Sequence, residues 1–194
     1  MFNGAHTALV TPFREREFDE PAFRKLIDTQ FENGIAGIVP CGTTGESPTL
    51  SHDEHARVIE IAIDATNGRG LVIAGTGSNS TREAIAMTQS AERAGADAAL
   101  LVCPYYNKPS QEGLFQHYKA IATSTKLPLM LYSIPGRSVI EITVDTQERL
   151  HNECPNIMAM KEAGGSPERV SQIKEQLPDS YQVLSGDDAL TLPF

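Results

Sequence analysis

Residues 157–165 (IMAMKEAGG) are the stretch that decides the fold, because an apolar run ends there in a single lysine, Lys161, before two glycines. Four consecutive apolar residues predict a strand that is buried on both faces, as in a parallel sheet. Lysine is almost never fully buried unless it is paired, so this position is unusual. Burial would lower the pKa of Lys161 and leave a neutral amine that can attack a carbonyl. The alternative is a strand-end lysine that simply reaches solvent.

Six further apolar runs are spaced along the chain between longer amphipathic segments. With residues 157–160 they give seven predicted strands, the others being residues 7–11, 35–41, 71–75, 98–103, 127–133 and 182–185. Helix start signals stand between the strands, at Asp19, Ser51, Ser80, Ser110, Thr143 and Ser166. Ser51 and Ser80 are each followed three positions later by a glutamate, which predicts capping boxes with Glu54 and Glu83. This alternation predicts a parallel α/β fold.

Two parallel architectures remain open, a doubly wound open sheet and a (β/α)8 TIM barrel. The fingerprint G-x-G-x-x-G is absent after the first strand, which weakens the open-sheet interpretation. Polar residues follow almost every strand, and a barrel would gather them on one face: Thr11, Thr43, Thr44, Thr76, Tyr105, Tyr106, Tyr132, Lys161 and Ser185. We therefore predict one α/β barrel domain over residues 1–194. Because only seven strands are found, we expect a barrel truncated after about the seventh strand, without the eighth strand and the C-terminal helices.

Composition narrows the class of protein further. The formal net charge of −9 argues against nucleic acid or an anionic membrane as a partner. No run approaches the roughly 20 apolar residues of a membrane span, and the first residues lack the pattern of a signal peptide. The three cysteines are odd in number and too few for a disulfide framework. We expect a reducing, cytoplasmic setting.

The second predicted strand runs into the turn Gly42-Thr43-Thr44-Gly45-Glu46. Its glycines allow a tight turn, and its N–H groups and threonine hydroxyls form a cradle that suits a carboxylate. Glu46 is predicted to accept hydrogen bonds from the backbone and so hold the turn. Taken alone, such a turn is more often only structural.

Aromatic residues follow the fourth and fifth predicted strands. Tyr105 and Tyr106 precede a rigid proline turn, where phenols suit proton relay, although two interface aromatics would explain them equally well. Tyr132 is predicted to face the site and to shuttle protons beside Lys161. Arg137 follows a Pro-Gly turn, and its planar guanidinium fits a carboxylate bidentately. The alternative for this arginine is a surface salt bridge that contributes little.

His52 and His55 stand at the start of a predicted helix together with Asp53 and Glu54. Such a cluster can suggest a metal site, but solvated polar residues are ordinary at a helix start. No third ligand with a fixed orientation is apparent, so we predict that the chain binds no metal.

Taken together, the motifs resemble the 4-hydroxy-tetrahydrodipicolinate (dihydrodipicolinate) synthase family, within the class I pyruvate aldolase superfamily that includes N-acetylneuraminate lyase. They occur in order along the whole chain, as residues 42–46 (GTTGE), 105–109 (YYNKP), 132–137 (YSIPGR), 161–163 (KEA) and 185–188 (SGDD). The combination is highly specific, although each motif alone is not. The resemblance implies a (β/α)8 barrel that condenses pyruvate with L-aspartate-4-semialdehyde to 4-hydroxy-tetrahydrodipicolinate, in lysine and diaminopimelate biosynthesis.

The resemblance also implies catalytic roles. Lys161 matches the lysine that forms a covalent imine with pyruvate, and the iminium is itself the electron sink, so no cofactor is required. Tyr132 matches the tyrosine that relays protons to the imine, and Thr43 the threonine that links two tyrosines in a hydrogen-bonded triad. Tyr106 matches the third member, which the family inserts into the site of the neighbouring subunit.

Substrate contacts and assembly follow from the same resemblance. Thr44 matches the hydroxyl that holds the pyruvate carboxylate, and Arg137 matches the residue that binds the carboxylate of the semialdehyde. Gly186, in the last motif, is placed with the substrate-binding residues. The resemblance further implies a homo-oligomer, a dimer of dimers in the full-length protein.

Some members of the family are inhibited by lysine, which binds at the dimer interface. The matching residues here are His52, His55, Gly77, Asn79, Glu83 and Tyr105. In this hypothesis Glu83 pairs with the α-amino group of lysine and Tyr105 meets its carboxylate; the alternative is that Glu83 only completes its capping box. The chain departs from the usual family pattern at Ser133, Gly136, residues 138–141 and Pro48, which we expect to tune loop geometry and ligand affinity without changing the reaction.

Two other functions remain open. A related pyruvate-dependent aldolase, such as an N-acetylneuraminate or keto-sugar acid lyase, would form the same imine with a different aldehyde. Arg137 argues against it, because the aldehyde partner of a neuraminate lyase is a neutral sugar. The second alternative is a non-catalytic protein, either a relative that only binds lysine or a catalytically inactive fragment.

Overall fold

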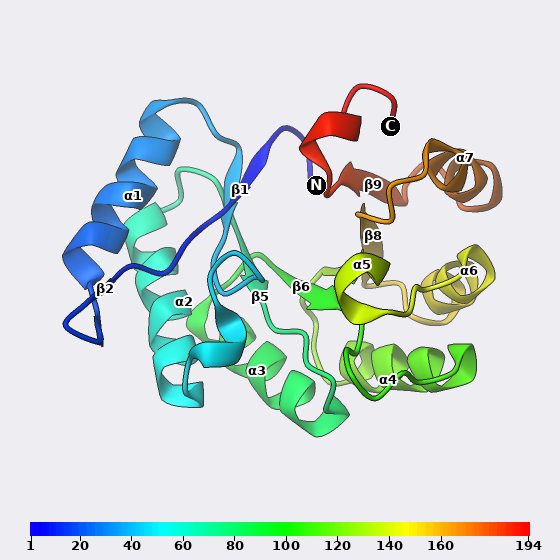
Figure 1. Ribbon diagram of the computed structural model, residues 1–194, viewed down its shortest axis with the longest axis horizontal. Coiled ribbons are helices and arrows are strands. Elements are labelled where there is room, and N and C mark those ends of the chain that lie inside the picture. The colour runs from blue at the N-terminus through cyan, green and yellow to red at the C-terminus, as the bar shows by residue number, and fades with distance from the viewer. The chain divides into compact units, whose positions relative to one another are not determined.

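The computed structural model describes residues 1–194 (Figure 1). The chain divides into two compact units. The first unit contains Met1–Thr76 and Ala86–Leu100, and the second contains Gly77–Ile85 and Leu101–Phe194. None of the helices combines the length and the apolar character that a membrane span requires.

The first unit is built on parallel strands in the order β1-β4-β5-β6. These strands are β1 (His6–Ala8), β4 (Gly37–Val39), β5 (Leu71–Gly75) and β6 (Ala98–Val102), the last two residues of β6 belonging to the second unit. The remaining elements are the hairpin of β2 (Phe13–Arg14) and β3 (Glu17–Phe18), α1 (Glu20–Glu32), the 3-10 turn η1 (Ser47–Thr49), α2 (His52–Thr66) and most of α3 (Thr81–Ala94).

Helices α1 and α2 lie side by side (Figure 1) and cover an apolar core. Phe23 and Ile27 on α1 and Val58 on α2 are fully buried in this core, against Ile38 of β4 and Val72 of β5. Each buried side chain of this size contributes on the order of 1.5–3 kcal/mol relative to an exposed one. The apolar faces of the two helices therefore account for their position against the strands.

The second unit is built on parallel strands in the order β7-β8-β9. These strands are β7 (Leu129–Ser133), β8 (Ile157–Glu162) and β9 (Gln182–Ser185). The helices are α4 (Gln111–Thr123), the single turn α5 (Pro135–Ser138), α6 (Val144–Glu153), α7 (Pro167–Gln176) and the 3-10 turn η2 (Asp188–Leu190). The longer helices pack in the order α4-α6-α7 (Figure 1).

All seven predicted strands are present, and most predicted caps are confirmed. Asp19, Ser51, Ser110, Thr143 and Ser166 each accept a backbone N–H at the start of a helix, and Ser51 forms the predicted capping box with Glu54. These are local signals, which depend on the spacing of a few neighbouring residues.

The second predicted capping box is formed only in part. Ser80 Oγ accepts the N–H of Glu83 at 3.4 Å, but the carboxylate of Glu83 accepts a hydrogen bond from Ser78 Oγ. Ser78 Oγ in turn accepts the N–H of Ser80 at 3.0 Å. Ser78 therefore lies between the two groups that a capping box would join directly.

Candidate active site

Lys161 lies one residue before the end of β8, which extends to Glu162, two residues further than predicted. In the sheet register Lys161 is paired with Tyr132 of β7 on one side and with Leu184 of β9 on the other. The Lys161 ammonium nitrogen Nζ lies 4.5 Å from the centroid of the Tyr132 ring. The structure therefore brings together the amine and the phenol that the sequence predicts to act together.

The surroundings of Lys161 favour the neutral amine. Burial lowers the pKa of Lys161 from its ordinary value, and the nearby negative charge of Asp188 opposes this effect. Lys161 is half-buried, and Tyr132 beside it is buried, with 6% of its surface exposed. The pKa shift has the direction that the sequence predicts, and a neutral amine is the form that attacks a carbonyl.

The absence of a side chain at Gly186 leaves space for the side chain of Lys161. A Cβ at position 186 would lie 2.8 Å from Cβ of Ala163 and 3.0 Å from Cε of Lys161, which is closer than side chains pack. The backbone N–H of Gly186 donates to the carbonyl of Glu162 at 2.7 Å. The strand end at β9 therefore approaches the lysine closely because position 186 has no side chain.

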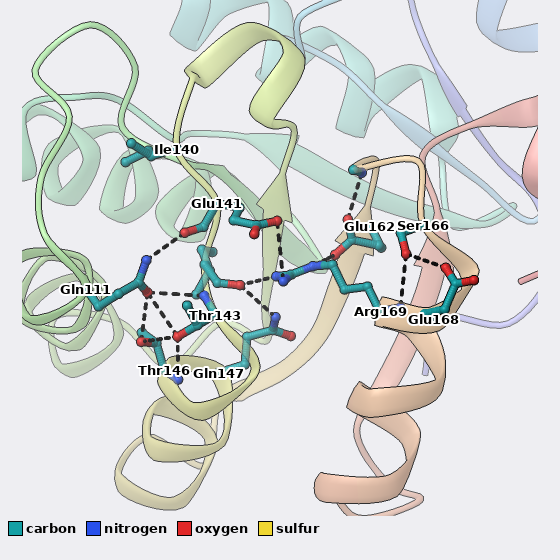
Figure 2. A network of polar contacts seen from close by, with 12 residues as sticks. Gln111, Ile140, Glu141, Thr143, Thr146, Gln147, Glu162, Ser166, Glu168 and Arg169 are labelled. Carbon is teal, nitrogen blue, oxygen red and sulfur yellow. Dashed lines mark hydrogen bonds and ion pairs between the residues drawn. The ribbon is translucent and has the colours of Figure 1, made fainter.

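A buried ion pair lies on the other face of β8 (Figure 2). Successive residues of a strand point to opposite faces, so the Glu162 side chain points away from that of Lys161. The Glu162 side chain is 0% exposed, and Arg169 Nε on α7 donates to its Oε2 at 2.8 Å. Sequence reasoning missed this pair. The available signal was a glutamate at the end of a buried strand and an arginine in the first turn of the helix that follows.

Arg137 lies on α5 and is exposed. The residue after this turn, Val139, adopts a left-handed conformation with φ of 71°, which is uncommon for a β-branched residue. Ser138 Oγ bridges the turn, because it lies 2.9 and 2.8 Å from the carbonyl oxygens of Ile134 and Ile140, which share its one proton. The sequence predicts only a Pro-Gly turn here, and the structure adds a helical turn that presents the guanidinium to solvent.

Tyr106 is 90% exposed and also has a left-handed backbone, with φ of 74°. The loop around it is anchored to the segment before α3, because Asn107 Nδ2 donates to the Asn79 carbonyl at 3.0 Å and Asn79 Nδ2 donates to the Tyr105 carbonyl at 3.1 Å. Gly77 precedes this segment, and a Cβ there would lie 2.3 Å from the backbone nitrogen of Val102. Four of the six residues predicted to bind lysine, Gly77, Asn79, Glu83 and Tyr105, are thus in the second unit.

The turn after β4, in the first unit, holds Thr43 and Thr44 with both side chains exposed. Backbone hydrogen bonds close the turn, and Thr11 Oγ1 donates to the Gly45 carbonyl at 2.7 Å. The prediction that Glu46 holds the turn is wrong, because Glu46 adopts a left-handed conformation and its side chain makes no capping hydrogen bond. The buried hydroxyl of Thr11 holds it instead.

His52 and His55 lie on the first turn of α2, also in the first unit. His52 is exposed, whereas His55 is buried and its Nε2 lies 2.9 Å from the carbonyl oxygen of Gly75. This hydrogen bond ties α2 to β5. The structure contains no group of three or more His, Cys, Asp or Glu side chains placed to hold a metal ion.

The predicted site residues are divided between the two units. Lys161, Tyr132, Gly186, Arg137 and Tyr106 belong to the second unit, and the threonine turn and both histidines belong to the first. The prediction that Thr43 and Thr44 face the lysine therefore stays a prediction.

Comparison with known proteins gives close relatives. Residues 1–194 match the family described as the dihydrodipicolinate synthetase family. The whole chain is 55% identical to 4-hydroxy-tetrahydrodipicolinate synthase of Pelagibacter ubique, of which it covers 66%. The solved structure of the synthase from Methylacidiphilum fumariolicum SolV aligns with 100% of this chain and 65% of its own length, at 54% identity and a TM-score of 0.99. The chain spans just under two thirds of the length of these relatives.

Two further solved structures contain ligands. The chloride-inhibited dihydrodipicolinate synthase of Acinetobacter baumannii, complexed with pyruvate, is 48% identical with a TM-score of 0.95, over 98% of this chain and 66% of that one. The enzyme of Cyanidioschyzon merolae with lysine bound is 45% identical with a TM-score of 0.96, over 99% of this chain and 66% of that one.

The strands, their parallel order within each unit and the similarity to these structures confirm the predicted (β/α)8-barrel fold class. The match to the family extends over every residue of the sequence. The chain belongs to the dihydrodipicolinate synthetase family.

Proposed function

We propose that this chain is a Schiff-base lyase that condenses pyruvate with L-aspartate-4-semialdehyde to 4-hydroxy-tetrahydrodipicolinate. The observation that carries the proposal is the half-buried Lys161 amine, with lowered pKa, 4.5 Å from the Tyr132 ring centroid. The relatives named 4-hydroxy-tetrahydrodipicolinate synthase support the same reaction. A neuraminate-type aldolase is less well supported, because Arg137 provides a cation for a carboxylate-bearing aldehyde.

The proposed reaction begins when the neutral amine of Lys161 attacks the ketone carbon of pyruvate. A C–N bond forms, the carbonyl oxygen leaves as water, and a protonated imine remains. Loss of a proton from the pyruvate methyl group gives an enamine, whose carbon attacks the aldehyde of the semialdehyde and leaves a hydroxyl group there. The amino group of the semialdehyde part then attacks the iminium carbon and displaces the Lys161 amine, which closes the ring and releases the product. Tyr132, beside the amine, is the group proposed to carry protons to and from these intermediates. The iminium accepts the electrons of the C–H bond, so the proposal includes neither a metal nor an organic cofactor.

The other site residues carry the roles that the family resemblance implies. Thr44 is proposed to hold the pyruvate carboxylate, and Arg137 to bind the carboxylate of the semialdehyde. Thr43 and Tyr106 are proposed to complete the proton relay with Tyr132. The 90% exposure of Tyr106 supports a role in a neighbouring subunit of a homo-oligomer, since a phenol at such a position is otherwise an unfavourable exposed aromatic.

Inhibition by lysine is part of the proposal, through His52, His55, Gly77, Asn79, Glu83 and Tyr105. The carboxylate of Glu83, which accepts from Ser78, supplies a negative charge for the α-amino group of the ligand. The relative from Cyanidioschyzon merolae with lysine bound supports this assignment. The setting is proposed to be cytoplasmic, which the three free cysteines support.

Borohydride trapping tests the proposed function directly. The protein is incubated with pyruvate, the imine is reduced with borohydride, and the modified lysine is located by mass spectrometry. The expected result is one pyruvate-derived adduct, on Lys161, that is absent from Lys161→Arg. An unmodified Lys161 in folded protein would overturn the proposal. Arg137→Leu should keep the adduct while losing the use of the semialdehyde, which separates the synthase from aldolases of neutral sugars.

A further inference from the structure

Beyond the residues that face the substrate, one network of charged and polar groups is centred on the buried ion pair of Glu162 and Arg169 (Figure 2). Its centre is Arg169 on α7, whose side chain is 11% exposed. The guanidinium uses three nitrogens on three acceptors: Nε donates to Glu162 Oε2 at 2.8 Å, Nη1 lies 3.4 Å from Glu141 Oε2, and Nη2 donates to the carbonyl of Ile142. A planar guanidinium can donate hydrogen bonds to three fixed acceptors at once, whereas a lysine ammonium on a flexible side chain does this poorly.

Glu162 connects this network to the reactive lysine. Its second oxygen, Oε1, accepts the backbone N–H of Gly164 at 2.7 Å, and its carbonyl accepts the N–H of Gly186 at 2.7 Å. Ala163 N donates to the Ser133 carbonyl at 3.0 Å. The backbone directly after Lys161 is therefore tied to β7, to the residue after β9 and, through the carboxylate, to α7.

The other end of the network holds the segment after Arg137. Gln111, the first residue of α4, donates from Nε2 to the Glu141 carbonyl at 2.8 Å, and its Oε1 accepts from Thr143 N at 3.1 Å and from Thr146 Oγ1 at 2.8 Å. Figure 2 shows this segment between Gln111 on one side and Arg169 on the other. Arg169 joins the segment to β8, since it contacts Glu141 and Ile142 as well as Glu162.

We propose that Arg169 is a positioning residue for imine formation: by pairing with Glu162 it holds the end of β8, and with it Lys161, against the segment that follows Arg137. The inference rests on the proposed function and deepens it. Arg169 lies behind the strand and does not touch the reacting atoms, since Glu162 and Lys161 point to opposite faces of β8. Its contribution is geometric, because an error of about 1 Å at a reacting group can cost a factor of about 100 in rate.

The test measures the rate of pyruvate trapping on Lys161 against pyruvate concentration and pH, per folded molecule as judged by near-UV circular dichroism. The variants are Arg169→Gln and Arg169→Lys. Lys174→Gln is the matched control, because it makes the same charge change on the same helix at an exposed ion pair with Asp179.

Arg169→Gln is expected to lower the trapping rate at saturating pyruvate at least about tenfold. It is also expected to move the pH midpoint of trapping upward, because Lys161 becomes more solvated and an unpaired carboxylate lies nearby. Tyr132 on β7 and Asp188 on η2 also face the amine, and they are unchanged in every variant. Arg169→Lys should restore part of the rate, and the control Lys174→Gln should stay within about twofold of wild type.

The outcomes separate the two proposals. Wild-type rate and wild-type pH midpoint in folded Arg169→Gln would show a purely structural ion pair and overturn the inference, while the proposed function stands. If Arg169→Gln does not fold, Arg169→Lys decides in the same way, since it keeps the charge but not the three-way contact. A wild-type protein that traps no pyruvate overturns the proposed function and this inference with it.

Discussion

The turn after β4 and the end of β8 both carry residues proposed to act on pyruvate, yet different forces hold them. The β4 turn is closed by neutral hydrogen bonds, including a buried one from Thr11 Oγ1 to the Gly45 carbonyl. The end of β8 is closed by a buried ion pair between Glu162 and Arg169. A neutral hydrogen bond contributes about 1 kcal/mol, whereas removal of one partner from a buried pair costs about 3–5 kcal/mol. The two regions should therefore differ in how they tolerate substitution.

The largest expected effect tests the charged side of this comparison. Arg169→Met should lower the free energy of unfolding by about 3–5 kcal/mol, because it leaves the Glu162 carboxylate buried without a cation. Urea unfolding followed by circular dichroism measures the change. The double variant Glu162→Met/Arg169→Met should recover much of the loss, since apolar residues of similar volume often replace a buried pair without cost. A single variant as stable as wild type would mean that the pair contributes nothing.

The next prediction concerns the reactive face of the same strand end. Gly186→Ala should reduce pyruvate trapping on Lys161 by a factor of about 10–100, because the new methyl group would lie within contact of Lys161 Cε and displace the amine. Gly136→Ala is the matched control, as a Cβ at that position meets nothing within 4 Å. Equal trapping by both variants would contradict the prediction, because it would show that the Lys161 side chain shifts to accommodate the methyl group without loss of reactivity.

At the neutral turn the expected loss is smaller. Thr11→Val keeps the shape of the side chain but removes the donor to the Gly45 carbonyl, and should lower the free energy of unfolding by about 1 kcal/mol. Thr11→Ser keeps the hydroxyl and serves as the control. The comparison between the two strand ends would fail if Thr11→Val cost as much as Arg169→Met in the same urea titration.

The smallest effect concerns the pH dependence of imine formation. Asp188 raises the pKa of Lys161 against the lowering effect of burial. Asp188→Asn should lower that pKa further, so the neutral amine persists to lower pH and the midpoint of trapping moves downward. The shift should be less than about one pH unit, because Asp188 is exposed and its field is screened. An upward shift, or an equal downward shift in the distant control Asp179→Asn, would contradict this account.

Much of the architecture could be predicted because its signals are local. Apolar runs identified every strand of the parallel sheets, and single polar residues identified the helix starts at Asp19, Ser110 and Thr143. The β2–β3 hairpin was not predicted, because its strands have only two residues each. The turn between them places Glu15 and Arg16 at positive φ, where hairpin turns usually have glycine, asparagine or aspartate.

The site was predicted less completely, for a physical reason. The pairing of Lys161 with Tyr132 follows from strand ends that share an edge of a sheet, so the sequence could indicate it. The roles of Thr11 and Arg169 could not be found in this way, because each depends on a contact made only when separate segments pack. Glu46 shows the converse error: its position in the motif suggested a contact that its left-handed backbone does not make.

The alternation of Lys161 and Glu162 along β8 has a consequence for how this sequence can change. A strand has two faces only, so inserting or deleting one residue inside β8 would exchange them. The amine would then turn toward α7 and the carboxylate toward the Tyr132 phenol. A single change of length would therefore remove both the contact of Lys161 with Tyr132 and the ion pair of Glu162 with Arg169. Changes of length should be confined to the turns, while β8 accepts only substitutions of like for like.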